Sequence, residues 1–514
     1  MPVSVALALT PVLLVAWLLL IRRAAADVAG GAGLLAAALI AWLYFDTDPA
    51  VIGASVLSGV IGSLPVGLVL AASLFQMLVM QQSGALARVV VFIKGLVPGQ
   101  KAVQALLLNM AFGVLLTSLG AATVSILPPI LLALGYSAFA AILLPALGYT
   151  AMCIYALLGI PAVVFAGFTG LSLHETGVLF ARYTPLVSLA VGLCTLYAAG
   201  GARLMREGIS PAIMAALAGG GTCVLMSRLG LVTITGIVAG AAMAGALLLY
   251  AAMRGLPVFR PAASTPEDRE AAQRFSLWRA CSPWLALTGL SLAINAPFLP
   301  FFQLVFRDWA MPVTIIPGAP EYTRPFWQAY FWVAVSTFVC LPLLRTNRAQ
   351  LRAAAGIFRR RAWRIILSTA VFFALAYVMN HSGKNAAWVL PAPGDNMIDV
   401  LALGAAALFG SLYPAITPGI GLLAGFVSGS QTSAVAMFTK LHMTTAGNLG
   451  VAGPLLAAAS AVGGGIAGVV SPAKILAAAA SIDRPEEAPA VMRVAFILAL
   501  IITCVCAAMT CGWL

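Results

Sequence analysis

Apolar segments long enough to cross a bilayer fill most of this 514-residue chain, and two of them are interrupted. The interruptions lie in LLTSLGAATVSILPP, residues 115–129, and in SGSQTSAVAMF, residues 428–438. Both place glycine, serine and threonine where a plain membrane helix carries leucine and valine. Irregular backbone at membrane depth is tolerated only inside protein or beside a water-filled cavity. Such a pair, with one member in each half of the chain, is typical of the binding site of a secondary transporter.

The composition predicts an all-α polytopic membrane protein. Hydrophobic residues make up 62% of the chain and charged residues 8%, whereas a soluble domain carries roughly 25% charged residues. Taking about 20 apolar residues for each crossing, we expect about 12 to 14 transmembrane segments. Two of these segments are expected to be interrupted or re-entrant, in an inverted-repeat-like arrangement.

Two polar stretches organise the chain. Residues 254–278 are expected to form a polar, cytoplasmic linker, with a local helix start at Thr265–Pro266. This linker divides an N-terminal membrane half, residues 1–253, from a C-terminal half, residues 279–514. The arginine-rich stretch 345–364 is expected in the cytoplasm, because basic residues flank the cytoplasmic ends of membrane segments. The net charge of +13 therefore indicates membrane topology, and no nucleic-acid partner is expected.

The finer structure of several segments follows less directly. Residues 51–80 are either one bent helix or two short ones, and residues 85–104 are either a surface helix or a loop. Lys101 and Arg203 are both basic and are expected in the cytoplasm, so the chain must cross the membrane an even number of times between them. Three apolar segments lie there, 104–134, 137–168 and 184–200, and 104–134 is the candidate for a re-entrant hairpin. Residues 137–168 and 449–470 are each expected to be a single apolar segment.

The motifs of the common membrane enzymes and pumps are missing. The chain has no HExxH, GxSxG or P-loop motif, and its eight cysteines form no CxxC pair. We therefore expect a protein that is not an enzyme, with no catalytic residues, cofactor or metal site. A carrier driven by an ion gradient is the function that this pattern favours.

The two interruptions could bind a small organic anion without an arginine. Helix N-termini at two hairpin tips that meet near the membrane midplane would present free backbone N–H groups and partial positive charge. Hydroxyls would complete the coordination, and glycine would allow close approach of the backbone. The predicted substrate-binding residues are Thr117, Ser118, Gly120, Ser430, Gln431, Thr432 and Ser433. The alternative is that these small residues serve close helix packing.

Ionisable residues near the apolar segments are candidates for ion coupling, because a charge within the membrane is costly. Lys440 and His442 follow the second interruption, and Glu175 lies in the stretch LSLHETG. In the alternative interpretation, Lys440 extends toward the membrane edge and Glu175 belongs to a connecting loop. His381 is expected to be a boundary residue, and Asp399 a helix cap.

Several stretches together carry a family likeness. They are FGVLLTSLGA, LLALGYSAFAA, ALLGIPAVVFAGFTGLS, LAYVMNHSG, SGSQTSAVAMF and AVGGGIAGVVSPAKILAAAAS, and they run in that order from about residue 105 to the C-terminus. In these stretches the chain resembles the L-lactate permease family, whose members take up lactate, glycolate and related 2-hydroxy monocarboxylates with protons. The resemblance implies a multi-pass protein of the plasma or inner membrane whose partners are a small organic anion, a coupled proton or sodium ion, and the lipid bilayer.

The chain departs from this family at both hairpins. The first hairpin of the family reads like FLEGAAGFGAP, with glutamate where this chain has Thr117. The second reads like GSDTSSNALF, with aspartate where this chain has Gln431. A buried carboxylate is a natural proton carrier, and without these acids the proton could move through His442 or Glu175. Alternatively, sodium could be coupled or transport could be uncoupled. The alternative functions are a carrier for a sulfonate or a dicarboxylate, and a non-transporting sensor or enzyme that kept the fold.

Overall fold

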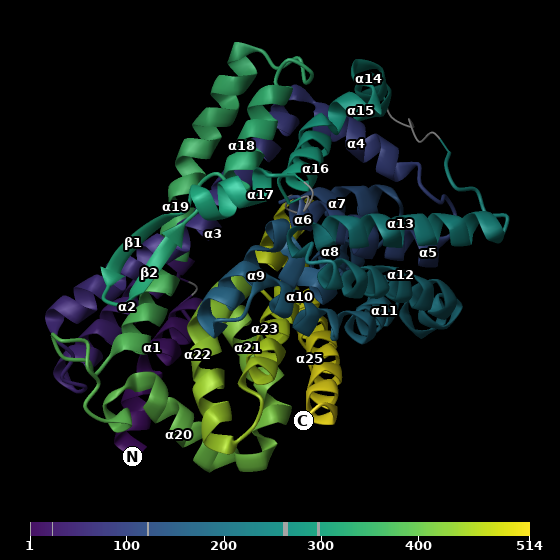
Figure 1. Ribbon diagram of the computed structural model, residues 1–514. Coiled ribbons are helices and arrows are strands. Elements are labelled where there is room, and N and C mark those ends of the chain that lie inside the picture. Colours follow the sequence, from purple (N-terminus) through teal and green to yellow (C-terminus); the bar gives the residue numbers. More distant parts are fainter. Residues whose placement is uncertain (1, 23, 121–122, 261–265, 296–298) are drawn as a thin grey trace.

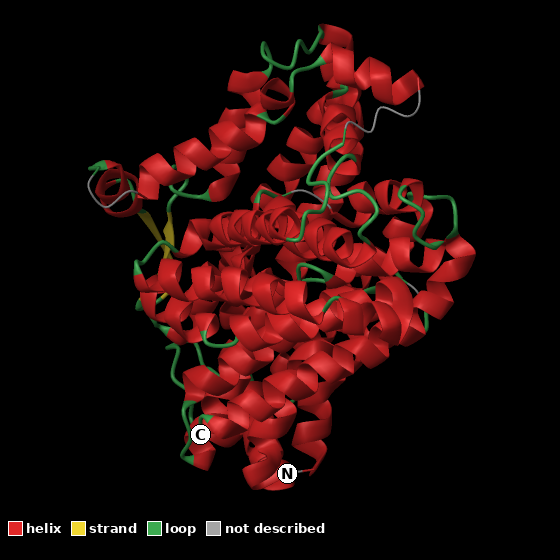
Figure 2. Ribbon diagram, turned by 90° about the vertical axis from the view of Figure 1, so that its right-hand side faces the viewer, coloured by secondary structure: helices red, strands yellow, loops and turns green. Residues whose placement is uncertain are grey.

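The computed structural model describes residues 2–22, 24–120, 123–260, 266–295 and 299–514. Helices make up most of this part of the chain (Figures 1 and 2). Its sheet is one antiparallel hairpin of β1 (Met311–Ile316) and β2 (Ala319–Thr323). Among the described residues, ten helices are long and apolar enough to cross a membrane, and five shorter apolar helices accompany them. The prediction of an all-α polytopic membrane protein is therefore confirmed.

Two unusually long helices pack along each other. Helix α3 (Pro49–Ser83) has 35 residues and α19 (Arg348–His381) has 34. A Cβ added at Gly59 of α3 would lie 2.6 Å from the Cα of Ala374, so the two backbones nearly touch. Segment 51–80 is therefore one helix. Most of the arginine-rich stretch belongs to α19, whose first turn is fixed by a capping box of Asn347 and Gln350.

Residues 85–104 were expected to be either a surface helix or a loop, and their first part, residues 85–94, is a helix. Helix α4 (Ala85–Lys94) runs alongside the linker helices α14 (Pro266–Arg274) and α15 (Leu277–Ala280). The Lys94 ammonium lies 2.9 Å from Oδ1 of Asp268 and ties α4 to α14. Thr265, the first residue of the predicted helix start, lies outside the described residues.

The remaining helices before the C-terminal half are short pieces and spans. They are α1 (Pro2–Leu20), α2 (Ala26–Leu43), α5 (Lys101–Leu106), the π-helical turn Leu107–Ala111, α6 (Phe112–Ser118), α7 (Thr123–Ala133), α8 (Ala138–Leu147), α9 (Ala156–Thr169), α10 (Leu173–Ala181), α11 (Thr184–Glu207), α12 (Ile209–Arg228) and α13 (Thr235–Met253). The C-terminal half continues with α16 (Ser282–Asn295), α17 (Phe301–Gln303), α18 (Ala329–Cys340), α20 (Met397–Phe409), α21 (Tyr413–Ser428), α22 (Gln431–Leu449), α23 (Gly453–Ile466), α24 (Pro472–Ala480) and α25 (Ala488–Gly512).

The helices break at both predicted interruptions. Helix α6 ends at Ser118 and α7 begins at Thr123, while α21 ends at Ser428 and α22 begins at Gln431. Gly429 ends α21 in the left-handed conformation, with φ of 67°, where glycine has no Cβ to clash. Ser430 then caps α22, because its hydroxyl accepts from the backbone N–H of Ser433.

Two further breaks follow, one inside the apolar segment expected over 137–168 and one at the end of the segment expected over 449–470. Between α8 and α9 lies a 3-10 helix, η2 (Thr150–Tyr155), and Leu157 and Leu158 at the start of α9 have φ of 52° and 57°. Between α23 and α24 lies a second 3-10 turn, η7 (Ala467–Val469). Each half therefore contains a broken hairpin followed by a broken helix. The order is α6, α7 and α8–η2–α9 in the first half, and α21, α22 and α23–η7–α24 in the second.

Contacts between these pieces bring the two halves together in the centre of the molecule. Helix α22 packs on α9, α23 packs on η2, and α24 packs on α7 and α8. In Figure 1 the yellow-green helices α21, α22 and α23 accordingly lie beside the blue helices α9 and α10. The broken segments of one half are thus packed against those of the other.

Candidate functional site

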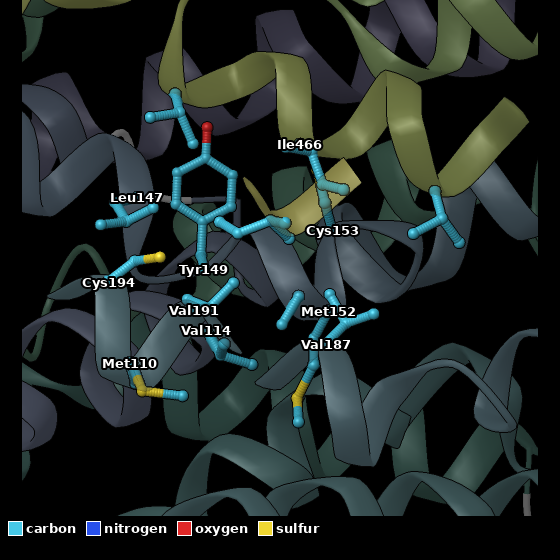
Figure 3. Packing of buried hydrophobic residues seen from close by; sticks show 14 of the residues in the cluster. Met110, Val114, Leu147, Tyr149, Met152, Cys153, Val187, Val191, Cys194 and Ile466 are labelled. Carbon is cyan, nitrogen blue, oxygen red and sulfur yellow. The ribbon is translucent and has the colours of Figure 1, made fainter. Parts of the chain in front are cut away.

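The two 3-10 turns meet at one point. Nζ of Lys474, in α24, donates to the hydroxyl of Tyr149, at the start of η2, over 2.8 Å. A Cβ added at Gly468 in η7 would lie 3.0 Å from the Tyr149 hydroxyl and 3.2 Å from the Lys474 ammonium. Figure 3 shows the ring of Tyr149 among buried side chains, with its hydroxyl directed toward the ribbon of the C-terminal half. The crossing of η2 and η7 therefore joins the halves through a polar contact.

The tip of the second hairpin lies against α23, with Gln431 as its main polar contact. The Gln431 amide nitrogen donates to the carbonyl of Ala461 over 2.8 Å. Its amide oxygen is buried and has no hydrogen-bond partner among the described residues. Thr432 and Ser433, which follow in the first turn of α22, are also buried. The predicted residues 430–433 thus form one compact group at the start of α22.

The start of α24 faces the same hairpin tip. Ser471 precedes Pro472, whose fixed φ suits the first helical position. The Ser471 side chain is 1% exposed, and its hydroxyl has no hydrogen-bond partner in the described part of the chain. A Cβ added at Gly429 would lie 3.7 Å from this hydroxyl. Two helix N-termini, those of α22 and α24, therefore come together here, and Lys474 lies in the first turn of α24.

The first interruption packs against different helices. Gly120 has φ of 86°, and a Cβ there would collide with the hydroxyl of Ser73 in α3. The hydroxyl of Ser118 lies against Gly236 of α13. The hydroxyl of Thr117 is buried and lacks a hydrogen-bond partner within the described structure. The predicted residues of this interruption thus lie close together, in contact with α3 and α13.

The contacts of the two predicted clusters meet at the junction of η2 and α9. On one side, Cys153 and Gln431 flank Gly465 of α23, at 3.1 and 2.9 Å from a Cβ added there. On the other side, the side chain of Leu157 lies 3.4 Å from a Cβ added at Gly120. Residues 153–157 therefore pass between the two hairpin tips. The two clusters are brought to neighbouring turns of one segment.

The three ion-coupling candidates lie in different surroundings. His442 is fully buried, with Nδ1 2.8 Å from the hydroxyl of Tyr413 and Nε2 without a partner among the described groups. Nζ of Lys440 donates to the backbone carbonyl of Asn380 over 3.4 Å. His442 and Lys440 thus both lie on α22, which packs against α9, α20, α21 and α23.

Glu175 is exposed in the first turn of α10 and forms a capping box with Ser172. Hydrogen bonds from the hydroxyl and the backbone N–H of Ser172, at 2.7 and 2.8 Å, lower the pKa of this carboxyl. Through these contacts, Glu175 stabilises the N-terminus of α10 as part of its capping box. Asp399 lies in the first turn of α20, where the side chain of Asn396 caps the helix.

Three residues of the central crossing were not predicted from the sequence: Tyr149, Ser471 and Lys474. Lys474 lies in SPAKILAAAA, a mostly apolar run that follows the segment expected over 449–470. A lone cation in such a run is itself a signal, since intramembrane lysine is rare and costly. Among the described residues, no group of three or more His, Cys, Asp or Glu side chains could hold a metal ion.

A cavity of about 530 Å³ opens beside the start of α9. Its walls come from α3, α9 and α19, and Arg324 and Gln328 line it in the segment between β2 and α18. Arg324 is held in place by a hydrogen bond from Nε to the carbonyl of Phe306, 2.9 Å long. Ile160, which also lines the cavity, is three residues beyond Leu157, so the cavity lies close to the first interruption.

Comparisons with known proteins identify the family of the chain. The family profile described as L-lactate permease matches residues 4–317 and 329–512. The glycolate permease GlcA of Escherichia coli (strain K12) is 25% identical over 535 residues, which cover 93% of this chain and 90% of that protein. The L-lactate permease of Bacillus subtilis (strain 168) is 25% identical over 529 residues, with coverage of 92% and 89%.

The solved structure of the YdaH transporter of Alcanivorax borkumensis shares 14% sequence identity, with a TM-score of 0.43 and coverage of 89% of this chain and 87% of that one. The family profile covers nearly the whole chain, and the apolar helices supply its membrane spans. This multi-pass integral protein of the plasma membrane therefore belongs to the L-lactate permease family.

Proposed function

We propose that the chain is a secondary transporter that moves L-lactate or a related 2-hydroxy monocarboxylate across the plasma membrane. The observation that carries this proposal is the central crossing, where a broken hairpin and a broken helix from each half pack together. Transporters with such repeats bind substrate where the broken helices of the two halves meet. The L-lactate and glycolate permeases that resemble the chain support this substrate class.

In this proposal, substrate binds at the two hairpin tips. Ser430, Gln431, Thr432 and Ser433 contribute from the second tip, and the N-terminus of α22 provides backbone N–H groups for an anion. Thr117, Ser118 and Gly120 contribute from the first tip. The unpartnered hydroxyl of Thr117 and amide oxygen of Gln431 support this assignment, because buried polar atoms without a partner are rare.

A cation gradient drives uptake in this proposal, and the coupled ion is a proton or sodium. His442 and Lys440 on α22 are the main candidates, and the unpartnered Nε2 of His442 can accept a proton. Glu175 is a weaker candidate, because the capping box already uses its carboxylate. Movement of one bundle against the other would expose the site to each side in turn.

The direct test is uptake of labelled L-lactate by proteoliposomes under an imposed proton gradient and then under a sodium gradient. Uptake under either gradient supports the proposal, and no uptake under both contradicts it. Replacing Ser430 and Thr432 together with alanine should raise the apparent KM for lactate. Thr222→Ala is the matched control, because its hydroxyl only bonds Ala218 within α12.

The same vesicles distinguish the rival functions. An excess of a small sulfonate or of a dicarboxylate, added outside, should inhibit lactate uptake less than unlabelled glycolate does. If either inhibits more strongly than glycolate, the chain is a carrier for that anion class. If no small anion is taken up, the fold serves a sensor or an enzyme instead.

A further inference from the structure

We infer that Lys474 and Ser471 form a clamp for the carboxylate of the transported anion, between the N-termini of α22 and α24. This inference rests on the proposed transport function and assigns the group that neutralises the substrate charge. Neither residue belongs to the two interruptions that mark the hairpin tips in the sequence.

The first argument is charge balance. Lys474 is partly buried where α24 packs against α7 and α8, and its hydrogen bond goes to the neutral hydroxyl of Tyr149. The ion pairs found within the described structure join other residues, so no Asp or Glu side chain there lies within 4.0 Å of its ammonium. An ammonium in a region of low dielectric without a counter-charge is strongly disfavoured. A bound carboxylate would supply the missing negative charge.

The second argument is the position of Lys474 in its helix. It is the third residue of α24, where the backbone N–H groups carry partial positive charge. A cation in the first turn of a helix opposes this dipole, so the lysine does not stabilise α24. The N-terminus of α22 adds further positive potential, because Gly429 brings it beside Ser471. Three sources of positive potential therefore converge in one place.

The third argument is the unused hydroxyl of Ser471. This side chain is 1% exposed, and its hydroxyl has no partner within the described structure. It neither caps α24 nor bonds the neighbouring hairpin tip. A buried hydroxyl without a partner loses its hydrogen bonds with water and gains nothing in return. A carboxylate oxygen between α22 and α24 would accept from it.

The test compares Lys474→Met, Lys474→Arg and Ser471→Ala in the purified full-length chain. Lys101→Met is the control, because Lys101 is exposed at the start of α5. The first readout is binding of L-lactate and of lactamide, its uncharged amide. Lys474→Met should raise the Kd for lactate by at least about tenfold, the size of one charged hydrogen bond. It should leave the weak binding of lactamide nearly unchanged, whereas Lys474→Arg should retain part of the preference for the anion.

The second readout is the melting temperature without ligand. Because Lys474→Met removes an uncompensated cation, its melting temperature should equal or exceed that of the wild-type chain. This result would separate a binding role of Lys474 from a structural one. Ser471→Ala is the smaller change and should also weaken lactate binding, so the clamp remains testable if Lys474→Met does not fold. If the wild-type chain binds lactate and both variants bind it equally well, the clamp is overturned and the transport function stands. If the wild-type chain binds no small carboxylate, both are overturned.

Discussion

At the scale of single residues, Gly120 shows how the first interruption is held. Its φ of 86° disfavours any side chain, and a Cβ would collide with the hydroxyl of Ser73. We expect Gly120→Ala to destabilise the protein by about 1–2 kcal/mol from the backbone conformation alone, and to lower the melting temperature in detergent. Gly245→Ala in α13 is the control, since nothing lies within 4 Å of a Cβ there. Equal melting temperatures for the two variants would contradict this role of Gly120.

Gln431 allows a test that depends on pH. In Gln431→Glu, an ionised carboxylate would face the carbonyl of Ala461 in place of the present donor. We expect this repulsion to cost about 1–3 kcal/mol of stability at alkaline pH, as for other broken buried hydrogen bonds. At acidic pH the protonated carboxyl can donate again, so stability should return. Gln431→Met removes the donor without adding charge, and its loss of stability should not change with pH; thermal unfolding at several pH values measures both.

For Glu175 the pH dependence of stability runs in the opposite direction to that of Gln431→Glu. The hydrogen bonds from Ser172 lower the pKa of the Glu175 carboxyl in the folded protein. The capping box therefore stabilises α10 fully at pH values above the ordinary pKa of a glutamate. That stabilisation is lost as the pH falls through the lowered pKa. We expect Glu175→Gln to keep the pH dependence of lactate uptake, because glutamine retains an oxygen that can accept from Ser172. A flattened pH profile would instead make Glu175 a carrier of the coupled proton.

The sequence reveals the polar residues of the hairpin tips, but it does not reveal Ser471 and Lys474 as part of the same site. Hydroxyl-rich stretches such as TSLGA and SGSQTS stand out against apolar surroundings. Ser471 and Lys474, in contrast, become a site only when η7 turns the chain back toward Gly429. That proximity is a product of tertiary packing, which no local pattern records.

At the scale of helices, close backbone contact holds the second hairpin to α23. Cβ atoms at Gly421 and Gly463 would collide with the carbonyl oxygens of Ser460 and Pro418. We expect Gly421→Ala to push α21 away from α23 and to reduce both the melting temperature and lactate uptake. Gly419→Ala, in the same helix, has open space around its Cβ and is the matched control. Unchanged uptake in both variants would show that this contact is not required.

The helix class follows from composition, whereas the 3-10 turns do not. The apolar runs leave few alternatives to membrane helices, and Gly429 with Ser430 marks one helix end by its residue types. The turns η2 and η7 lie in sequences that remain apolar throughout. Gly463 to Gly465 weaken the end of α23 just before η7. Packing between the halves, however, decides where the helices break.

At the scale of the whole molecule, the basic half of α19 fixes the orientation in the membrane. If the positive-inside rule holds, Arg352 lies in the cytoplasm and the β1–β2 hairpin lies outside. After replacement of the exposed Cys504 and Cys511 by serine, a membrane-impermeant maleimide should label Thr314→Cys on intact cells. It should label Arg352→Cys only after the membrane is opened. The reverse pattern would invert the topology.

The seam between α3 and α19 also constrains the synthesis of the protein. The backbones of Gly59 and Ala374 nearly touch, yet the ribosome makes them far apart in time. At about 5–20 residues per second, the roughly 300 residues between them take roughly 15 to 60 seconds. During this interval α3, about 52 Å long at 1.5 Å per residue, presents its glycine face to lipid or to an insertase. The nascent N-terminal half is therefore a long-lived intermediate whose largest partner has not yet been translated.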